Sequence, residues 1–327
     1  MKSFFLILCC FCLSIGFAQN STLSSSTKYQ KDTLITITAN PGAGFLHDYL
    51  LFIPKGASKG KRTYLLVEPN NSGFTSDSIE KHREAAIFLA TQRSIGNNVS
   101  TELKVPFLVP VFPRSKSHSL IYTHALDRDA MLAEDEEIRR LDLQLLAMIA
   151  DARPRLEELE VPVEEKVFMS GFSASGSFVN RFAFLHPEKL KAVSTGGLNA
   201  ILMLPKEQMN GQSLNYPLGI NDLQEITGKN WNDQRYRELP QFIFMGALDD
   251  NDAVPYDDAY NDEERKVIYA TVGKQMQPER WEKCQQIYKV EGINAKFRAY
   301  PEVGHWSTGE INLDVIMFFM EQMKNLK

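Results

Sequence analysis

Short apolar stretches alternate with helix-patterned stretches along most of this chain, and that alternation limits the folds open to it. Apolar runs of strand length lie at 34–38, 49–53, 63–67, 105–112, 166–169, 192–195, 241–245 and 295–300. Helices are predicted at 76–92, 134–153, 175–185, 281–290 and 311–323. Continuous apolar strands separated by helices are typical of a parallel sheet that is covered on both faces. We therefore predict an α/β fold with a mostly parallel central sheet and helices on both faces.

The segment 199–240 is long for a connection inside such a sheet. Long irregular connections usually serve as lids or binding loops, so we expect an insertion over the functional site. No repeat or Ser/Gly/Pro-rich linker divides the chain, which predicts a single domain over 20–327. The insertion carries apolar side chains that either pack in the core or line a substrate pocket: Leu202, Met203, Met209, Tyr216 and Trp231.

Composition and charge exclude several classes of protein. The 327 residues are 43% hydrophobic and 24% charged, which excludes low-complexity and disordered chains. The 36 basic and 41 acidic residues give a net charge of −5, so we expect no nucleic-acid partner. The sequence also lacks a polybasic membrane anchor.

The N-terminus has the pattern of a secretory signal peptide at 1–19. Lys2 precedes an apolar run over 4–17, and a small residue, Ala18, follows it. The run is shorter than the roughly 20 residues of a membrane span, although an uncleaved anchor remains an alternative. Cleavage would remove three of the four cysteines, leave Cys284, and change the net charge to −6. We therefore expect a secreted or periplasmic protein without an internal disulfide or stable membrane insertion.

The most informative motif lies where the apolar run 166–169 meets the helix predicted at 175–185. It reads Gly-Phe-Ser-Ala-Ser-Gly over 171–176. A strand that leads into Gly-x-Ser-x-small and then a helix is the context of a nucleophile elbow, a strained turn that exposes the serine. Ser173 is the candidate nucleophile, and Ser175 offers a second frame of the same motif.

Two further candidates follow the last two predicted strands. Asp249 lies three residues beyond Gly246, after the run 241–245, and His305 follows the run 295–300. Asp252 and Asp250 are alternative acids in the same loop. Active sites in open parallel sheets form at the carboxyl ends of the strands, so we expect these side chains near Ser173.

With its order Ser…Asp…His at strand ends, the chain resembles the α/β-hydrolase superfamily over nearly the whole of 20–327. Within that superfamily it is similar to secreted esterases of the polyhydroxybutyrate-depolymerase and feruloyl-esterase type. The resemblance implies that Ser173 is the nucleophile, His305 the general base and Asp249 the acid that orients the imidazole.

An acyl intermediate also requires backbone N–H donors for its oxyanion. The elbow places the Ala174 N–H at the start of a helix, where an anion is favoured. The second donor is expected from the loop 69–73, with Asn71 as the candidate. The family often has a His-Gly string in that loop, and this sequence does not.

These features predict an exported serine hydrolase, acting on a small-molecule or polymeric carboxylic ester through an acyl-enzyme. An acyltransferase or peptidase with the same triad is an alternative, as is a binding protein on a hydrolase scaffold. No cofactor or metal is expected, because the dinucleotide, zinc and calcium motifs are missing from the sequence. For the acids of 249–264, a solvated loop with one catalytic member is favoured over the alternative of a Ca²⁺ site.

Overall fold

The computed structural model describes residues 27–92 and 94–324. The expected signal peptide, 1–19, lies outside the described residues. Within these residues no helix is both long and apolar enough to cross a membrane.

The central element is an eight-stranded sheet with the order β1-β2-β4-β3-β5-β6-β9-β10. Its strands are β1 (Thr33–Ile37), β2 (Tyr49–Ile53), β3 (Leu66–Val67), β4 (Phe107–Pro110), β5 (Val167–Phe172), β6 (Leu190–Gly196), β9 (Gln241–Gly246) and β10 (Ala295–Tyr300). Strand β2 is antiparallel to both of its neighbours, and every other pair in this sheet is parallel. The prediction of a mostly parallel sheet is therefore confirmed.

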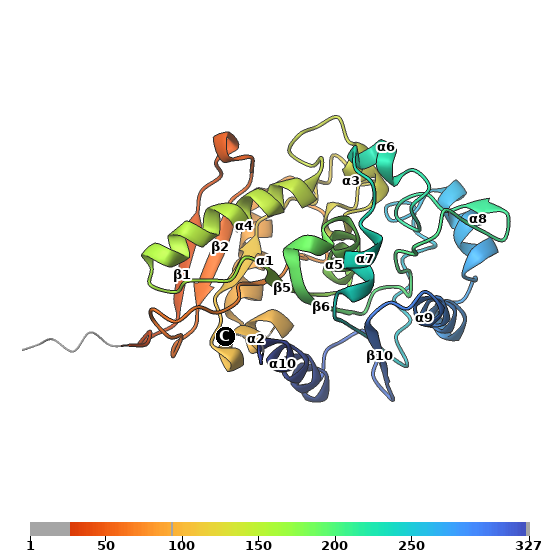
Figure 1. The fold of residues 1–327 in the computed structure, drawn as a ribbon. Helices are drawn as coiled ribbons and strands as arrows, with labels where there is room; N and C mark the ends of the chain where they lie inside the picture. The colour runs from red at the N-terminus through yellow and green to blue at the C-terminus, as the bar shows by residue number, and fades with distance from the viewer. Residues whose placement is uncertain (1–26, 93, 325–327) are drawn as a thin grey trace, which may run out of the picture.

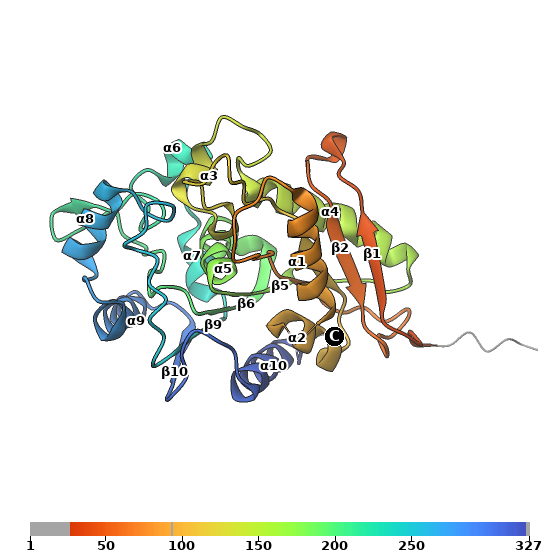
Figure 2. The ribbon, with the colours of Figure 1, turned by 180° about the vertical axis from the view of Figure 1, so that it is seen from behind.

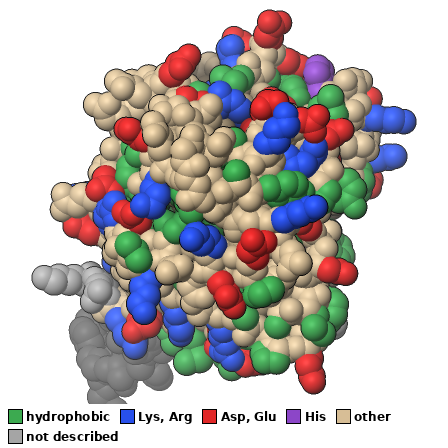
Figure 3. Space-filling view, turned by 90° about the vertical axis from the view of Figure 1, so that its right-hand side faces the viewer, with side chains coloured by type: hydrophobic (Ala, Val, Ile, Leu, Met, Phe, Trp, Pro, Cys, Tyr) green, Lys and Arg blue, Asp and Glu red, His purple; other side chains and the backbone are tan. Residues whose placement is uncertain are grey.

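Helices cover both faces of the sheet (Figures 1 and 2). One face carries α1 (Ile79–Thr91), α2 (Ile95–Leu103) and α10 (Gly309–Met323), whose buried side chains share one apolar cluster. The other carries α4 (Leu141–Glu158), α5 (Ala174–Leu185) and α9 (Trp281–Val290), which share a second cluster. Shorter elements are α3 (Arg128–Leu132), α6 (Leu223–Thr227), α7 (Asp233–Glu238), α8 (Asp262–Thr271) and the ribbon of β7 (Gln208–Met209) and β8 (Gln212–Ser213). The face that includes α8 and α9 intersperses acidic and basic side chains (Figure 3).

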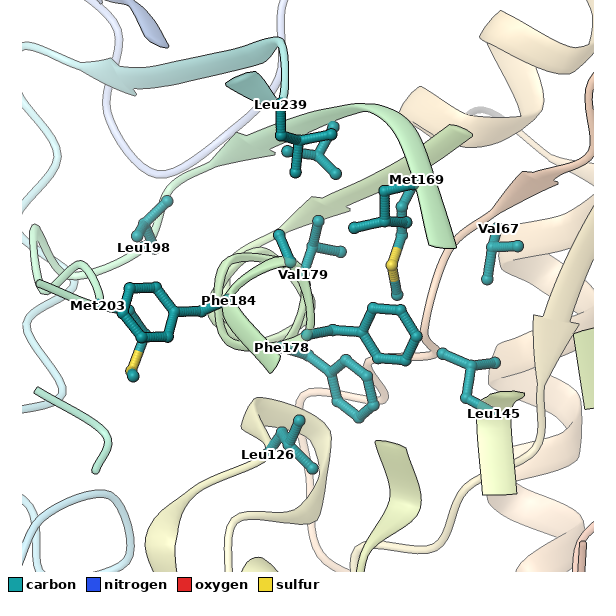
Figure 4. Close-up of a cluster of buried hydrophobic side chains, with 14 of the residues drawn as sticks. Val67, Leu126, Leu145, Met169, Phe178, Val179, Phe184, Leu198, Met203 and Leu239 are labelled. Atoms are coloured by element: carbon teal, nitrogen blue, oxygen red, sulfur yellow. The ribbon is translucent and has the colours of Figure 1, made fainter. Parts of the chain in front are cut away.

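The core helix α5 is buried almost all round, which explains why its sequence is apolar on several faces. Phe178, Val179 and Phe184 lie in the same cluster as Met169 of β5 (Figure 4). Because α5 follows β5 directly, this packing fixes the turn between them, which holds Ser173.

One predicted helix differs from the structure at both ends. The helix expected at 134–153 starts at Leu141, after Arg140 with a φ of 49°, and it continues to Glu158. It passes through Pro154, which removes the bond to the carbonyl of Ala150. Both Pro154 and Ala150 are exposed, so water can replace the missing donor. The proline therefore does not end this helix.

The apolar side chains singled out in the segment 199–240 pack in or against the core. Met203 is 1% exposed and is drawn within the cluster of Figure 4. Tyr216 is fully buried and donates its hydroxyl to the carbonyl of Leu126 at 2.5 Å. Trp231 stacks on Phe184 with ring centroids 4.6 Å apart. Leu202 belongs to the same core cluster, and Met209 packs against it.

Candidate active site

The backbone is strained at Ser173, between the last residue of β5 and the first of α5. Ser173 has φ 63° and ψ −129°, a conformation that residues with a side chain rarely adopt. A Cβ on Gly171 would lie 2.3 Å from the carbonyl oxygen of Ser175, so only glycine fits there. Such strain persists where the surrounding packing imposes it, and it clusters at functional sites.

The two serines of the motif have different environments. Ser175 is 1% exposed, and its hydroxyl donates to the carbonyl of Phe172 at 2.9 Å and accepts from the N–H of Phe172 at 3.0 Å. Ser173 is partly exposed and contacts a histidine. The hydroxyl of Ser175 therefore closes the turn, and that of Ser173 is the one presented to solvent.

Ser173, His305 and Asp249 form a continuous chain of contacts. The Oγ of Ser173 lies 2.9 Å from Nε2 of His305. The Nδ1 of His305 lies 2.9 Å from Oδ2 and 3.1 Å from Oδ1 of Asp249. Asp249 accepts only if Nδ1 carries the proton, and that tautomer leaves Nε2 free to accept from the serine hydroxyl. The structure brings these three candidate residues together, and their catalytic roles stay predictions.

Close backbone contact between two loops holds the acid and the histidine together. A Cβ on Gly246 would lie 2.3 Å from the carbonyl oxygen of Val303, so the glycine permits this approach. The Leu248 N–H donates to the same carbonyl at 2.8 Å. The amide of Gln277 donates to the carbonyl of Gly246 at 2.7 Å. The loop that carries Asp249 is thereby fixed on two sides.

The alternative acids lie elsewhere. Asp252 contacts the buried guanidinium of Arg280, with 2.5 Å between Oδ2 and Nη2. Asp250 is exposed. Because Asp249 is the carboxylate in contact with His305, the geometry favours it over both alternatives as the acid.

The two candidate oxyanion donors lie in unlike settings. The Ala174 N–H is in the first turn of α5, where backbone donors have no intrahelical acceptor. Asn71 lies in the loop after β3, and its side chain accepts from the Gly73 N–H at 3.2 Å. The pocket beside Ser173 includes Ala174 in its lining but not Asn71. The role of Asn71 stays a prediction.

A buried network of histidines anchors that loop. The hydroxyl of Ser72 lies 2.6 Å from Nδ1 of His82, whose Nε2 lies 2.9 Å from the carbonyl of Ser76. Asn70 bonds both the N–H and the carbonyl of Phe112, each at 2.9 Å. Burial lowers the pKa of the neighbouring His124 to about 3, so its ring is neutral at ordinary pH.

A small hollow opens beside Ser173. Its lining consists mainly of small and polar residues: Tyr122, Ala125, Ser173, Ala174, Ser177, Arg181, Gly197, Asn199, Asn251, Ala253, Ala259 and Tyr260. Asn199 is the one contribution of the segment 199–240, so the apolar side chains proposed from that segment do not line this pocket. These apolar side chains pack in or against the core, where burial removes their apolar surface from water.

Several residues of this pocket were not predicted. Asn251 places its amide nitrogen 3.2 Å from Nε2 of His305, and Arg181 and the two tyrosines line the wall. Arg181 carried one available signal: it is the charged residue in an otherwise uncharged elbow helix, eight positions after Ser173. No group of three or more metal-ligating side chains occurs within 27–92 and 94–324.

Neither family models nor curated proteins match the sequence. The structure of this chain, by contrast, is similar to those of solved proteins. The poly(aspartic acid) hydrolase-1 of Sphingomonas sp. KT-1 is similar, with a TM-score of 0.57, 14% identity, and coverage of 89% of this chain and 98% of that one. This chain has the α/β-hydrolase fold.

Two further solved structures are similar at TM-scores below 0.5. Est1E of Butyrivibrio proteoclasticus has a TM-score of 0.44 at 15% identity and covers 88% of this chain and 98% of its own. Carboxyl esterase 2 of the fungus Tuber melanosporum has a TM-score of 0.48 at 10% identity, with coverage of 95% and 91%.

Proposed function

We propose that this protein is a serine hydrolase that cleaves carboxylic esters through an acyl-enzyme. The observation that carries the proposal is the chain of contacts from Ser173 through His305 to Asp249. The strained turn at Ser173 and the pocket beside it support the same proposal. The similar fold of a poly(aspartic acid) hydrolase supports hydrolysis as the class of reaction.

In the first half of the reaction the Oγ of Ser173 attacks the ester carbonyl carbon while Nε2 of His305 takes the hydroxyl proton. The tetrahedral oxyanion is stabilised by the Ala174 N–H at the positive end of α5. The intermediate collapses as the bond to the alcohol breaks, and the imidazolium returns its proton to the leaving oxygen. Asp249 stabilises the imidazolium while it exists.

In the second half water attacks the acyl-enzyme. Nε2 of His305 takes a proton from the water, and the bond from the acyl carbon to the Oγ of Ser173 breaks. The proton then passes from the imidazolium to the serine oxygen. The products are a carboxylic acid and an alcohol, and the free enzyme is restored.

A fluorophosphonate probe tests the nucleophile. We expect the probe to label the intact protein and to leave Ser173→Ala unlabelled, with Ser175→Ala as the matched control that retains its label. Mass spectrometry of the labelled peptide identifies the modified serine. Labelling that persists in Ser173→Ala, or its absence from the intact protein, contradicts the proposal.

We also propose that the protein is exported and that residues 1–19 are removed. This proposal rests on the sequence pattern at the N-terminus. N-terminal sequencing of the secreted or periplasmic fraction should then start at Asn20. A full-length protein that stays with the membrane fraction contradicts it.

A further inference from the structure

The wall of the pocket contains a buried guanidinium, that of Arg181, which pairs with no carboxylate among the residues that the structure describes. Arg181 is 4% exposed and lines the hollow together with Ser173 and Ser177. Its Nη1 donates to the carbonyl of Ala125 at 2.8 Å and its Nη2 to the hydroxyl of Tyr260 at 2.9 Å. Both acceptors are neutral. Within 27–92 and 94–324, no carboxylate oxygen is recorded within 4 Å of this guanidinium.

The other strongly buried arginines differ in this respect. Arg114 is 8% exposed and pairs with Asp258 at 2.6 Å, and Arg280 is fully buried and pairs with Asp252 at 2.5 Å. A buried charge without a counter-charge is costly, so proteins normally pair it. Arg181 is thus the exception among these three, and it is the one that lines the pocket.

The two acids that act electrostatically on Arg181, Asp127 and Glu264, are bonded to backbone groups. Asp127 accepts from the N–H groups of Tyr122 and Ala130, at 2.7 and 2.8 Å. Glu264 accepts from the N–H of Asn261 at 2.9 Å. Burial raises the pKa of Asp127 to about 7, so near neutral pH this acid supplies only part of a counter-charge.

The helix directs Arg181 toward the nucleophile. Ser173, Ser177 and Arg181 are spaced four residues apart, which places them along one side of α5. Eight residues of α-helix rise about 12 Å, and helical side chains lean toward the N-terminus. The long side chain of Arg181 therefore extends back along the pocket toward Ser173, within the range of a short substrate chain.

We propose that Arg181 binds a carboxylate of the substrate, so that the preferred ester carries a negative charge a few bonds from the scissile carbonyl. The inference rests on the proposed function, because it assigns a substrate class to the same site. A guanidinium matches a carboxylate in charge and in the geometry of its donors. The carboxylate can belong to the acyl part or to the alcohol part of the ester.

Pairs of charged and neutral esters of the same shape test the proposal. On the acyl side, mono-4-nitrophenyl glutarate is compared with 4-nitrophenyl methyl glutarate. On the alcohol side, 4-acetoxybenzoate is compared with its methyl ester. We expect the intact protein to prefer the charged member of one pair in kcat/KM, after subtraction of spontaneous hydrolysis. The pair that shows the preference identifies the source of the carboxylate.

Arg181→Gln should lower the charged-to-neutral ratio of kcat/KM by about 10- to 100-fold, the value of a hydrogen bond to a charged group. Arg181→Lys should give an intermediate ratio. The ratio does not depend on how much of a variant is folded. Arg280→Gln is the matched control, since it removes an equally buried guanidinium outside the pocket, and its ratio should equal that of the intact protein.

A second measurement does not require turnover. Glutarate should slow fluorophosphonate labelling of the intact protein in a saturable manner, and Arg181→Gln should weaken this protection by the same factor. Dimethyl glutarate is the neutral control. If the intact protein is labelled but prefers neither charged ester, or if Arg181→Gln keeps the ratio, the inference is wrong and the proposed function stands. If the protein is not labelled at all, the proposed function itself fails.

Discussion

Among the described residues, two serine hydroxyls lie close to an imidazole nitrogen, and the two pairs differ in what lies on the far side of the ring. Ser173 lies 2.9 Å from His305, and Ser72 lies 2.6 Å from His82. The other ring nitrogen of His305 contacts the carboxylate of Asp249, whereas that of His82 contacts the neutral carbonyl of Ser76. Only the first histidine therefore has a partner that would stabilise a positive charge on its ring.

The two serines also differ in backbone and access. Ser173 has a positive φ at the start of a helix and borders the pocket, whereas Ser72 lies in a loop and does not line it. His82 is fully buried. A short serine–histidine distance is thus compatible with a reactive pair and with a structural one. The counter-charge, the strain and the access separate them.

The largest expected effect tests which pair reacts. Ser173→Ala should lower kcat for a 4-nitrophenyl ester by on the order of 10⁴–10⁶, because the nucleophile is lost. Ser72→Ala should lower it far less, since that hydroxyl only anchors a loop. Steady-state kinetics on proteins of matched folded fraction measure both. A loss of similar size in Ser72→Ala would contradict the assignment of roles.

The next largest effect is expected at Asp249, the candidate acid. Asp249→Asn should lower kcat by about 10⁴, as loss of the orienting carboxylate does in serine-triad enzymes. Asp252→Asn should instead lower the free energy of unfolding, by about 3 kcal/mol, because it leaves Arg280 buried without its partner. Kinetics and urea unfolding of both variants measure these effects. The opposite pattern would identify Asp252 as the acid.

Much of the fold could be predicted because strands and helices leave local signals. The run at 241–245 is almost wholly apolar and precedes Gly246, whereas the run at 295–300 alternates apolar with basic residues and precedes Pro301. They form β9 and β10. Helix α2 was missed, because its sequence is largely polar and it is held by packing of Ile95 and Val99 and by the cap at Ser94. Tertiary packing of that kind leaves little periodicity to detect.

The candidate site was only partly within reach of the sequence. Strand ends predict that Ser173, Asp249 and His305 converge, because parallel strands end at one edge. Their catalytic roles stay predictions. The wall of the pocket was not predictable, since it depends on how the loops that carry Tyr122 and Tyr260 fold back over α5. Their positions are set by contacts between distant residues, such as the bond from Arg181 to Tyr260.

A smaller effect on kcat is expected at the pair of Ser72 and His82. His82→Leu should lower kcat about tenfold, part of what the loss of an oxyanion donor costs, because the loop 69–73 loses its anchor. The change should affect kcat more than KM if the loop supplies a donor used in the transition state. His186→Leu is the control, because it also removes a buried histidine, which contacts Asp142 at 2.8 Å. It should lower the free energy of unfolding without the tenfold fall in kcat. Equal kinetics in both variants would remove the loop from the mechanism.

The last prediction concerns stability and the carboxylate beside the second pair's loop. Glu68 is 3% exposed and directly precedes the loop 69–73. Its Oε2 accepts a hydrogen bond from the Gly96 N–H at 2.9 Å. Burial raises the pKa of Glu68 from its ordinary value to about 8, so the folded state favours the protonated form. Its contribution to stability is complete below about pH 4.5 and is lost as the pH rises through 8.

Residue 68 cannot titrate in Glu68→Gln. The free energy of unfolding of this variant, relative to that of the intact protein, should therefore rise between pH 5 and 8 by up to about 1.4 kcal/mol per pH unit. Urea unfolding at unit steps of pH measures the difference. Asp142→Asn is the opposite control, since bonds from His186 and Arg140 outweigh burial and lower the pKa of Asp142 to about 2. That stabilisation is present above its ordinary pKa and disappears in acid. Parallel pH profiles of stability for Glu68→Gln and the intact protein would mean that Glu68 is ionised in the folded state. The pair of Ser72 and His82 would then have a negative charge nearby, as the pair of Ser173 and His305 does.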